Sequence, residues 1–309
     1  MDAVKVVTGA GPVGWTVATQ LAEAGQHVRV LTRSGSGPDH PGIERLRVDV
    51  SHPGALRASL AGADAIFHCV HGSKYNAETW RRELPAAEQV VLAAAGEGGA
   101  VVVFPESLYS YSQPSAVMAE DSPRLAEGGK RGVRTLLLAA RAASPTPTVS
   151  VVASDFFGPQ VRNAHAGERM VPQLLRGRRV SVVARADVPH SFTYVPDLAA
   201  AMIRAAAMPG LWNSVLHAPT NPALTQRALA AAFTSAAGLP APKVGAVPAW
   251  VLRASGMFSS DVRDLAETLY QFQRPFIMDS AASQELLGLA PTPLETAAKE
   301  TVEWWRGQA

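Results

Sequence analysis

The sequence contains a single cysteine, no leader-like segment and no long apolar run. Cys69 alone can form neither an internal disulfide nor a thiolate metal cluster, which suits a reducing compartment. The chain does not open with a basic segment followed by an apolar one, and no uncharged apolar stretch reaches the ~18 residues that a bilayer span requires. We therefore expect a cytoplasmic protein with no membrane partner.

Charge is also scarce. Charged residues make up 17% of the chain against roughly 25% in an average domain, and the net charge is only +2 although the pI is 8.8. The densest basic run, residues 176–179, has no interleaved aromatic residues, so we interpret it as a solvated loop rather than a phosphate-binding site. No nucleic-acid partner is expected. The sparsely charged surface would allow a homodimer.

Two common kinds of catalytic site find no support. His68 and His71 lie three residues apart at a strand end rather than on a helix, and no carboxylate is spaced to join them, so we expect no metal site. The chain lacks a Gly-x-Ser-x-Gly elbow, which removes the commonest serine hydrolase interpretation.

Apolar, strand-like runs alternate with helix-like stretches over the first half of the chain. The runs are residues 4–8, 28–32, 46–50, 65–70, 101–104 and 148–153. Such alternation is typical of a parallel sheet covered on both faces by helices. The clearest helix, residues 12–24, begins near Pro12 and stops at Gly25. The pattern predicts an α/β fold with a doubly wound parallel sheet.

From about residue 154 the pattern loosens into short strands, prolines and scattered helices, expected at 197–208, 225–237 and 294–305. No linker or repeat separates this part from the first. We predict a dinucleotide-binding domain over residues 1–153. Residues 154–309 form a smaller substrate-binding cap, interleaved with that domain rather than tethered to it.

A glycine-rich loop follows the first predicted strand and opens the first helix. Gly9, Gly11 and Gly14 give Gly-x-Gly-x-x-Gly in the context that the Rossmann fingerprint requires. The first glycine permits a tight turn, the second lets the backbone approach a pyrophosphate, and the third lets helix and strand pack closely. Together with Pro12 and Val13, these residues are expected to hold a dinucleotide on free N–H groups at the helix start.

The end of the second strand indicates which dinucleotide binds. An NAD site usually has an acidic residue there, whereas this chain has Thr32 followed by Arg33 and Ser34. A guanidinium group and a hydroxyl suit a 2′-phosphate, so we expect NADP(H) to be preferred, with NAD(H) as the alternative. Asp49 and Val50 are expected at the adenine, although Asp49 would serve equally well as a cap of the following helix.

These motifs, in this order, resemble the extended or atypical short-chain dehydrogenases/reductases, the NAD-dependent epimerase/dehydratase family. Further pieces along the whole chain agree: Ala-Ile-Phe-His at 65–68, Phe-Pro-Glu-Ser at 104–107, Phe-Gly-Pro at 157–159, Tyr-Val-Pro-Asp at 194–197, Leu-Leu-Gly at 286–288 and Thr-Val-Glu-Trp-Trp at 301–305. The resemblance implies a Rossmann-type sheet and hydride-transfer chemistry.

In that family a serine on the fifth strand and a Tyr-x-x-x-Lys pair carry out proton transfer, and the lysine also holds the cofactor ribose. Ser107 matches the serine and Lys130 the lysine, but Ala126 stands where the tyrosine should be. Val152 replaces an arginine that the nucleotide-sugar enzymes carry before the Gly-Pro turn. The resemblance therefore implies a substrate other than a nucleotide sugar.

Tyr109 is our hypothesis for the missing acid. Ser107, Tyr109 and Tyr111 follow the fifth strand at i, i+2 and i+4, so an extended backbone would turn all three toward the cleft. Both tyrosines would serve equally as walls of the pocket. Asp155 and His190, each beside aromatic residues, lie where family members bind substrate, and each would serve equally as a hydrogen-bonding loop residue.

The sequence therefore predicts an NADP(H)-dependent oxidoreductase, or an epimerase, acting on a small, moderately apolar carbonyl or hydroxyl compound. Ser107, Tyr109 and Lys130 are the expected catalytic residues, and Tyr111, Asp155 and His190 the expected substrate contacts. Two alternatives stay open, because a fold does not define a reaction. One is a non-catalytic dinucleotide sensor, and the other is a cofactor-bearing isomerase or cyclase of a biosynthetic pathway.

Overall fold

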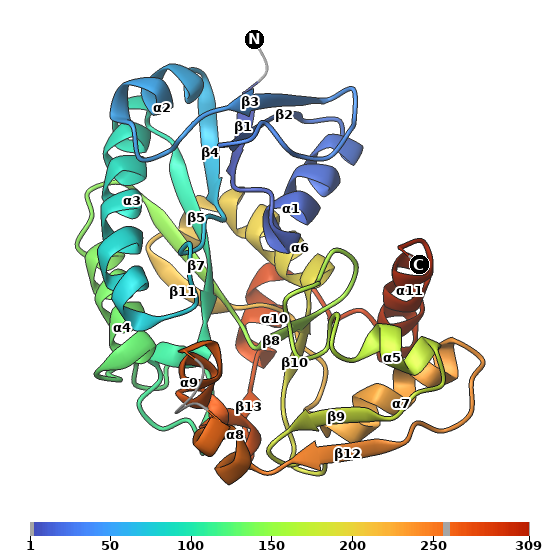
Figure 1. The fold of residues 1–309 in the computed structure, drawn as a ribbon. Helices are drawn as coiled ribbons and strands as arrows, with labels where there is room; N and C mark the ends of the chain where they lie inside the picture. The colour runs from blue at the N-terminus through green and yellow to red at the C-terminus, as the bar shows by residue number, and fades with distance from the viewer. Residues whose placement is uncertain (1–2, 256–259, 309) are drawn as a thin grey trace.

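A seven-stranded parallel sheet forms the centre of the structure, a computed structural model that describes residues 3–255 and 260–308 (Figure 1). The strand order is β11-β7-β5-β4-β1-β2-β3, and every neighbouring pair runs parallel. The strands are β1 (Val4–Thr8), β2 (His27–Thr32), β3 (Ile43–Arg47), β4 (Ala63–His68), β5 (Val101–Ser107), β7 (Thr148–Ala153) and β11 (Ser214–His217). The predicted Rossmann-type, doubly wound architecture is confirmed.

Helices cover both faces of this sheet, as Figure 1 shows. On one face lie α2 (Pro53–Ser59), α3 (Ala77–Gly98) and α4 (Gly129–Ala142), packed side by side. On the other lie α1 (Pro12–Glu23) and α6 (Val195–Ala206), which pack against each other. The central strands are buried on both faces because each face meets a layer of apolar helix side chains, and this explains their continuous apolar runs.

The third strand is displaced from its predicted position. It spans Ile43–Arg47 rather than residues 46–50, so Asp49 and Val50 lie in the loop after it. β3 is the last strand of the sheet and pairs only with β2, and most of its side chains are at least partly exposed. A continuous apolar run marks a buried strand and is therefore a poor guide to an edge strand.

Beside the main sheet, the described residues form three small two-stranded sheets. The strand pairs are β8 (Asp155–Phe157) with β10 (Phe192–Tyr194), β9 (Val180–Val183) with β12 (Val244–Val247), and β6 (Val117–Met118) with β13 (Ile277–Met278). The remaining helices and short 3₁₀ turns of the described chain are α5 (Val171–Leu175), α7 (Gln226–Ala236), α8 (Ala249–Ser255), α9 (Ser260–Ala266), α10 (Ala281–Leu287), α11 (Leu294–Arg306), η1 (Leu108–Ser110), η2 (Pro209–Leu211) and η3 (Leu269–Phe272). The cap at the lower right of Figure 1 contains β9, β12, α5, α7 and α11. A separate apolar core joins α5, α7 and α11.

The two parts of the chain share elements. α6 and β11 come after residue 154, yet α6 covers the sheet beside α1 and β11 forms its outer edge next to β7. In the other direction, β6 lies before residue 153 and pairs with β13. No helix within the described residues combines the length and apolar content that crossing a bilayer requires.

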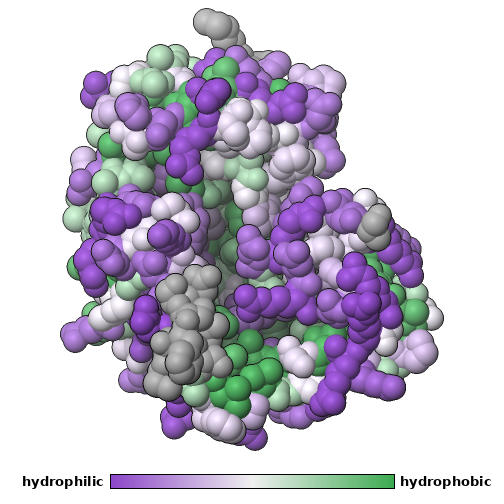
Figure 2. All heavy atoms as spheres, viewed as in Figure 1, coloured by the Kyte–Doolittle hydropathy of each residue, from purple (hydrophilic) through white to green (hydrophobic). Residues whose placement is uncertain are grey.

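The strand order reverses between β1 and β4, and in open α/β sheets ligands bind outside the carboxyl ends of the strands at such a point. In Figure 2 this face of the molecule is hollowed between the sheet and the cap. The glycine loop follows the carboxyl end of β1, Ser107 ends β5 and Asp155 follows β7, so the candidate site lies at these strand ends.

Candidate active site

The glycine loop has the geometry of an anion-binding turn. Gly9 has φ +86°, which favours glycine, and a Cβ on Gly14 would lie 2.0 Å from the Gly9 carbonyl oxygen. A Cβ on Gly11 would meet nothing within 4 Å in the described structure. Gly11 is the N-cap of α1, and no side chain caps that helix end. The first amide groups of α1 therefore remain available to a phosphate group at an open approach.

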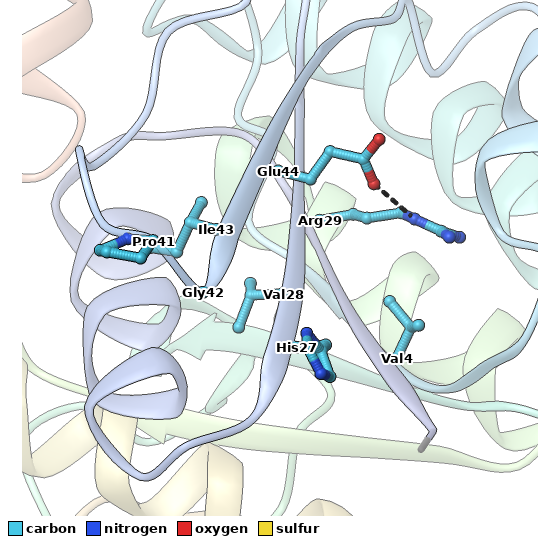
Figure 3. Close-up of a pocket in the computed structure, with 8 residues that line it drawn as sticks. All are labelled: Val4, His27, Val28, Arg29, Pro41, Gly42, Ile43 and Glu44. Carbon is cyan, nitrogen blue, oxygen red and sulfur yellow. Dashed lines mark hydrogen bonds and ion pairs between the residues drawn. The ribbon is translucent and has the colours of Figure 1, made fainter. Parts of the chain in front are cut away.

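A second hollow lies at the amino ends of the strands, at the opposite end of the sheet from the glycine loop. Figure 3 shows it between the amino ends of β1, β2 and β3, where the guanidinium group of Arg29 bonds Glu44. Its lining residues are Val4, His27, Val28, Arg29, Pro41, Gly42, Ile43 and Glu44. Because parallel strands share one direction, this hollow is a sheet length away from the glycine loop and takes no part in the candidate site.

Arg33 follows β2 directly and is exposed, and its side chain forms no hydrogen bond or ion pair with the part of the chain that the structure describes. Arg47, at the end of β3, donates from Nε to the Arg33 carbonyl at 3.1 Å. The Ser34 hydroxyl donates to Ser36 Oγ at 2.9 Å. The sequence predicted Arg33 and Ser34 but missed Arg47, which brings a second guanidinium group to the same strand ends.

Asp49 does not cap the following helix, so that alternative is wrong. Its Oδ1 accepts from the Ser51 amide at 3.0 Å and the Ser51 hydroxyl at 2.7 Å, and α2 begins at its N-cap His52 without a side-chain cap. These bonds to Ser51 hold the pKa of Asp49 below its usual value. Asp49 is half-exposed and remains an open acceptor, while Val50 is buried.

The expectation of an extended backbone after β5 is wrong, because η1 turns the chain immediately after Ser107. Tyr109 and Tyr111 consequently point in different directions. Tyr111 is 1% exposed and donates its hydroxyl proton to His217 Nε2 at 2.5 Å, since His217 Nδ1 already donates to the Asp279 carbonyl. Tyr111 is a core residue, and its assignment as a substrate contact is withdrawn.

Tyr109 lies instead in an aromatic cluster with Tyr75 and Trp80. Its ring is parallel to Trp80 at 6.2 Å, and its hydroxyl is hydrogen-bonded to that of Tyr75. Burial, followed by the charges of Tyr75 and Asp155, raises the pKa of Tyr109 well above 10. Ser107 lies nearby in the chain, and its amide and hydroxyl both face the carboxylate of Glu106, the hydroxyl at 3.3 Å.

Lys130 lies against this cluster, with Nζ 4.0 Å from the centre of the Tyr75 ring. Its side chain is fully buried, donates to the Asp264 carbonyl at 2.5 Å, and lies 3.5 Å from Glu267 Oε2. The other oxygen of Glu267 accepts from the Lys130 amide at 2.6 Å. Burial lowers the pKa of Lys130, and the charges of Glu267 and Asp264 act in the opposite direction. Lys130 is thus engaged by Asp264 within α9 and by Glu267, the residue that follows this helix.

The structure also changes the register of the expected catalytic pair. α4 begins at Gly129, so Ala126 precedes the helix and cannot share a helix face with Lys130. Within the helix, the residue that shares a face with Lys130 at i, i+4 is Arg134, on the other side of Lys130 from the expected tyrosine. Arg134 lies 4.8 Å over the ring of Trp80 and 3.4 Å from Glu106, and its Nε has no partner among the described residues. That spacing was visible in the sequence and was the signal for Arg134.

Asp155 and His190 come together although 35 residues separate them. His190 Nε2 lies 2.6 Å from Asp155 Oδ2, and Nδ1 faces the Gln271 carbonyl at 3.1 Å. Asp155 begins β8, two residues after Ala153, which pairs with Ser107 across β5 and β7. The pair therefore lies at the same edge of the sheet as Ser107. No sequence signal indicated Tyr75, Glu267 or Gln271, which join this site from distant segments.

Comparisons with known proteins identify the family and the fold of this chain. The model of the NAD dependent epimerase/dehydratase family matches residues 5–213. An uncharacterized protein, y4nG, of Sinorhizobium fredii is 25% identical over 215 residues, which are 66% of this chain and 53% of that protein, so the chain spans about half the length of this relative.

Solved structures share the fold over the whole chain. The Bordetella bronchiseptica enzyme WbmH, in complex with NAD+, is 17% identical, with a TM-score of 0.77 and 100% of both chains covered. The UDP-glucose 4-epimerase of Thermotoga maritima, with UDP-glucose, is 18% identical, with a TM-score of 0.77 and 99% of both chains covered. These likenesses establish the fold, and the family match over more than half of the sequence confirms the resemblance in the motifs: the chain belongs to the NAD-dependent epimerase/dehydratase family.

Proposed function

We propose that the protein is an NADP(H)-dependent oxidoreductase, or an epimerase acting through transient hydride transfer, on a moderately apolar carbonyl or hydroxyl compound. The observation that carries this proposal is the uncapped start of α1 beside the open position at Gly11, with the unengaged side chain of Arg33 at the end of β2. A bound nicotinamide supplies hydride transfer. Product analysis of candidate substrates with and without NADPH tests the proposal and separates an oxidoreductase from an isomerase or a sensor.

The described residues fit a phosphorylated dinucleotide. Gly11, Val13 and Gly14 would hold the pyrophosphate through backbone amides, while Gly9 turns the chain and Pro12, which has no N–H, starts the helix. Arg33, with Ser34 and Arg47, would bind the 2′-phosphate, and Asp49 with Val50 would border the adenine. Lys130 would reach the ribose only by exchanging its present bonds to Asp264 and Glu267.

Arg33→Ala tests the choice of cofactor. We expect the wild type to bind NADPH at least tenfold more tightly than NADH, about 1.4 kcal/mol or more, and the variant to lose this difference because the 2′-phosphate loses its guanidinium partner. Calorimetric titration with both cofactors measures it. Arg45→Ala is the matched control, since Arg45 lies on β3 and pairs with Asp39 at 3.3 Å. Equal affinity of the wild type for both cofactors would contradict the assignment.

For Tyr109 we propose a narrower role than that of a proton-exchanging acid. A group that exchanges protons works best with a pKa near the operating pH, whereas burial raises the pKa of Tyr109 and so moves it away from neutral pH. A phenol that retains its proton is a hydrogen-bond donor. With Ser107 it would polarise the substrate oxygen, as the donors of an oxyanion hole do.

Tyr109→Phe is expected to lower kcat by ~10²–10³ without changing the affinity for NADPH, because one donor to the substrate oxygen is removed. Steady-state kinetics at saturating cofactor, with calorimetry for the cofactor, provide the measurement. Tyr111→Phe is the control. It removes a buried hydrogen bond to His217 and should lower stability but leave kcat of the folded enzyme unchanged. A wild-type kcat for Tyr109→Phe would remove Tyr109 from the site.

A further inference from the structure

The side chain of His190 is held in one orientation, with Nε2 directed at Asp155. Its ring is stacked on Phe272 at 4.6 Å and lies 4.7 Å from Phe192 and 5.2 Å from Phe276, measured between ring centres. Both ring nitrogens already face protein oxygens, one on Asp155 and one on the Gln271 backbone. At 1% exposure His190 has neither a free nitrogen nor room to turn toward a ligand, so its function is to hold Asp155 in place.

Asp155 keeps a free acceptor. Only Oδ2 is hydrogen-bonded within the described part of the chain, and the side chain is 20% exposed while that of His190 is 1% exposed. Burial raises the pKa of Asp155, but the hydrogen bond and charge of His190 outweigh burial, and the net pKa is lowered. Asp155 is therefore a carboxylate at neutral pH, with Oδ1 available to a ligand.

Donors without partners surround the same place. The Tyr270 hydroxyl and Gln271 Nε2, both on η3, are buried and have no hydrogen-bond partner among the described residues, and Gln271 is only 2% exposed. η3 is held against the pair because the Gln271 carbonyl binds His190. Buried polar atoms are rarely left unpaired, so two unpaired donors on the segment that faces His190, together with the free oxygen of Asp155, indicate a site for a ligand that both donates and accepts hydrogen bonds.

His190 faces Oδ2 of Asp155, and no other side chain among the described residues forms an ion pair with Asp155. Burial lowers the pKa of His165, the other histidine within range of its charge. Lys130 is engaged by Glu267, and Arg134 by Glu106. The remaining groups affected by the Asp155 charge are phenols, namely Tyr75, Tyr109 and Tyr270. The position opposite Oδ1 therefore favours a hydroxyl donor and disfavours an anionic group, which has only acceptors to place against it.

We propose that Asp155 anchors the substrate by accepting a hydrogen bond from one of its hydroxyl groups, next to the reacting carbon, and that it excludes substrates with an anionic group at that position. The proposal rests on the proposed function and names its substrate class, a hydroxy ketone or the corresponding diol rather than a keto acid. Gln271 and Tyr270 complete the site by donating to substrate oxygens. His190 acts as a positioning residue, since it reaches the substrate only through Asp155.

Three ketones with one apolar body test this: acetophenone, 2-hydroxyacetophenone and phenylglyoxylate. In reduction with NADPH we expect the wild type to prefer the hydroxy ketone and to reject the keto acid. Asp155→Ala should raise KM for 2-hydroxyacetophenone roughly tenfold or more, the loss typical of a hydrogen bond to a charged group, with little change in kcat or in the reduction of acetophenone. Asp155→Asn should admit phenylglyoxylate, because the amide can donate a hydrogen bond to the substrate carboxylate.

Asp187→Asn is the matched control. Asp187 also pairs with a cation, Arg227 at 2.6 Å, but its side chain is 66% exposed, so every kinetic parameter should stay at its wild-type value. An unchanged preference for the hydroxy ketone in Asp155→Ala would overturn the proposal, as would continued rejection of phenylglyoxylate by Asp155→Asn.

A measurement that needs no turnover separates this proposal from the function on which it rests. The ¹³C carboxyl resonance of Asp155 should titrate below its usual range in the wild type and at higher pH in His190→Gln, where burial is no longer opposed. It should shift on addition of 2-hydroxyacetophenone but not of acetophenone. If none of the ketones is reduced and NADPH does not bind, the proposed function fails. If neither the His190→Gln substitution nor the hydroxy ketone changes the Asp155 resonance, the proposed role of Asp155 in binding substrate is wrong.

Discussion

Gly11→Val is expected to weaken NADPH binding more than roughly hundredfold, about 2.7 kcal/mol, in a protein that still folds. The Gly11 backbone has φ −71°, which any residue adopts, and a Cβ there meets no protein atom within 4 Å. The valine side chain would instead fill the space that a pyrophosphate needs above the start of α1. Calorimetry measures the affinity, and thermal unfolding should show a Tm within about 4 °C of the wild type.

Gly14→Val is the counterpart that separates binding from folding. Its Cβ would lie 2.0 Å from the Gly9 carbonyl oxygen, a backbone atom that cannot move aside without displacing α1 from β1. This variant should lose stability as well as binding. If Gly11→Val folds and binds NADPH with wild-type affinity, the pyrophosphate is held elsewhere and the proposed cofactor site is wrong.

Arg141→Met is expected to be the most destabilising single change, by about 3–5 kcal/mol. The Arg141 side chain, 3% exposed, donates to both oxygens of Glu88 at 2.5 and 2.8 Å, to Glu106 at 2.8 Å and to Ser150 at 3.0 Å. These residues tie α4 to α3, β5 and β7. Without the guanidinium group, Glu88 remains buried without its ion-pair partner, while Glu106 retains only Arg134 and Ser107. Urea-induced unfolding gives the change in the free energy of unfolding.

The effect of Arg141→Met should also depend on pH. Burial raises the pKa of Glu88, but Arg141 outweighs burial and the net pKa is lowered, so this carboxylate stabilises the wild type at neutral pH and the contribution is lost as pH falls through the folded-state pKa. The difference in the free energy of unfolding between wild type and variant should therefore become smaller as the pH falls. Arg57→Met is the control, because Arg57 and Glu97 form an exposed pair expected to contribute about 0–1 kcal/mol. Equal losses in both variants would contradict the role of the buried network.

The parts of the fold that the sequence predicted are those determined by local pattern. Continuous apolar runs located β1, β4 and β7 because those strands are buried on both faces, and the glycine spacing located the loop because its backbone needs glycine at Gly9 and Gly14. β3 was misplaced because an edge strand lacks that run. The turn at η1 was missed because alternation along a strand says nothing about where the strand ends.

The candidate site was less predictable, because its contacts join segments far apart in the chain. Asp155 and His190 were each chosen from the sequence, yet it is the parallel pairing of β8 with β10 that brings His190 Nε2 to 2.6 Å from Asp155 Oδ2. The bond from Lys130 to residue 264 and the position of Gln271 beside His190 depend on how the cap packs. Spacing within one helix, as for Lys130 and Arg134, is the only part of this cluster that a sequence pattern contains.

The position of β11 at the edge of the main sheet affects how the chain folds as it is synthesised. A nascent chain that has emerged only as far as residue 153 carries β7 as an unpaired edge strand, although all six of its side chains are buried in the finished protein, and it lacks the helix α6 that covers α1. Unpaired apolar edges promote aggregation. The main sheet therefore gains its last strand, and α1 its covering helix, only after residues 195–217 have been synthesised.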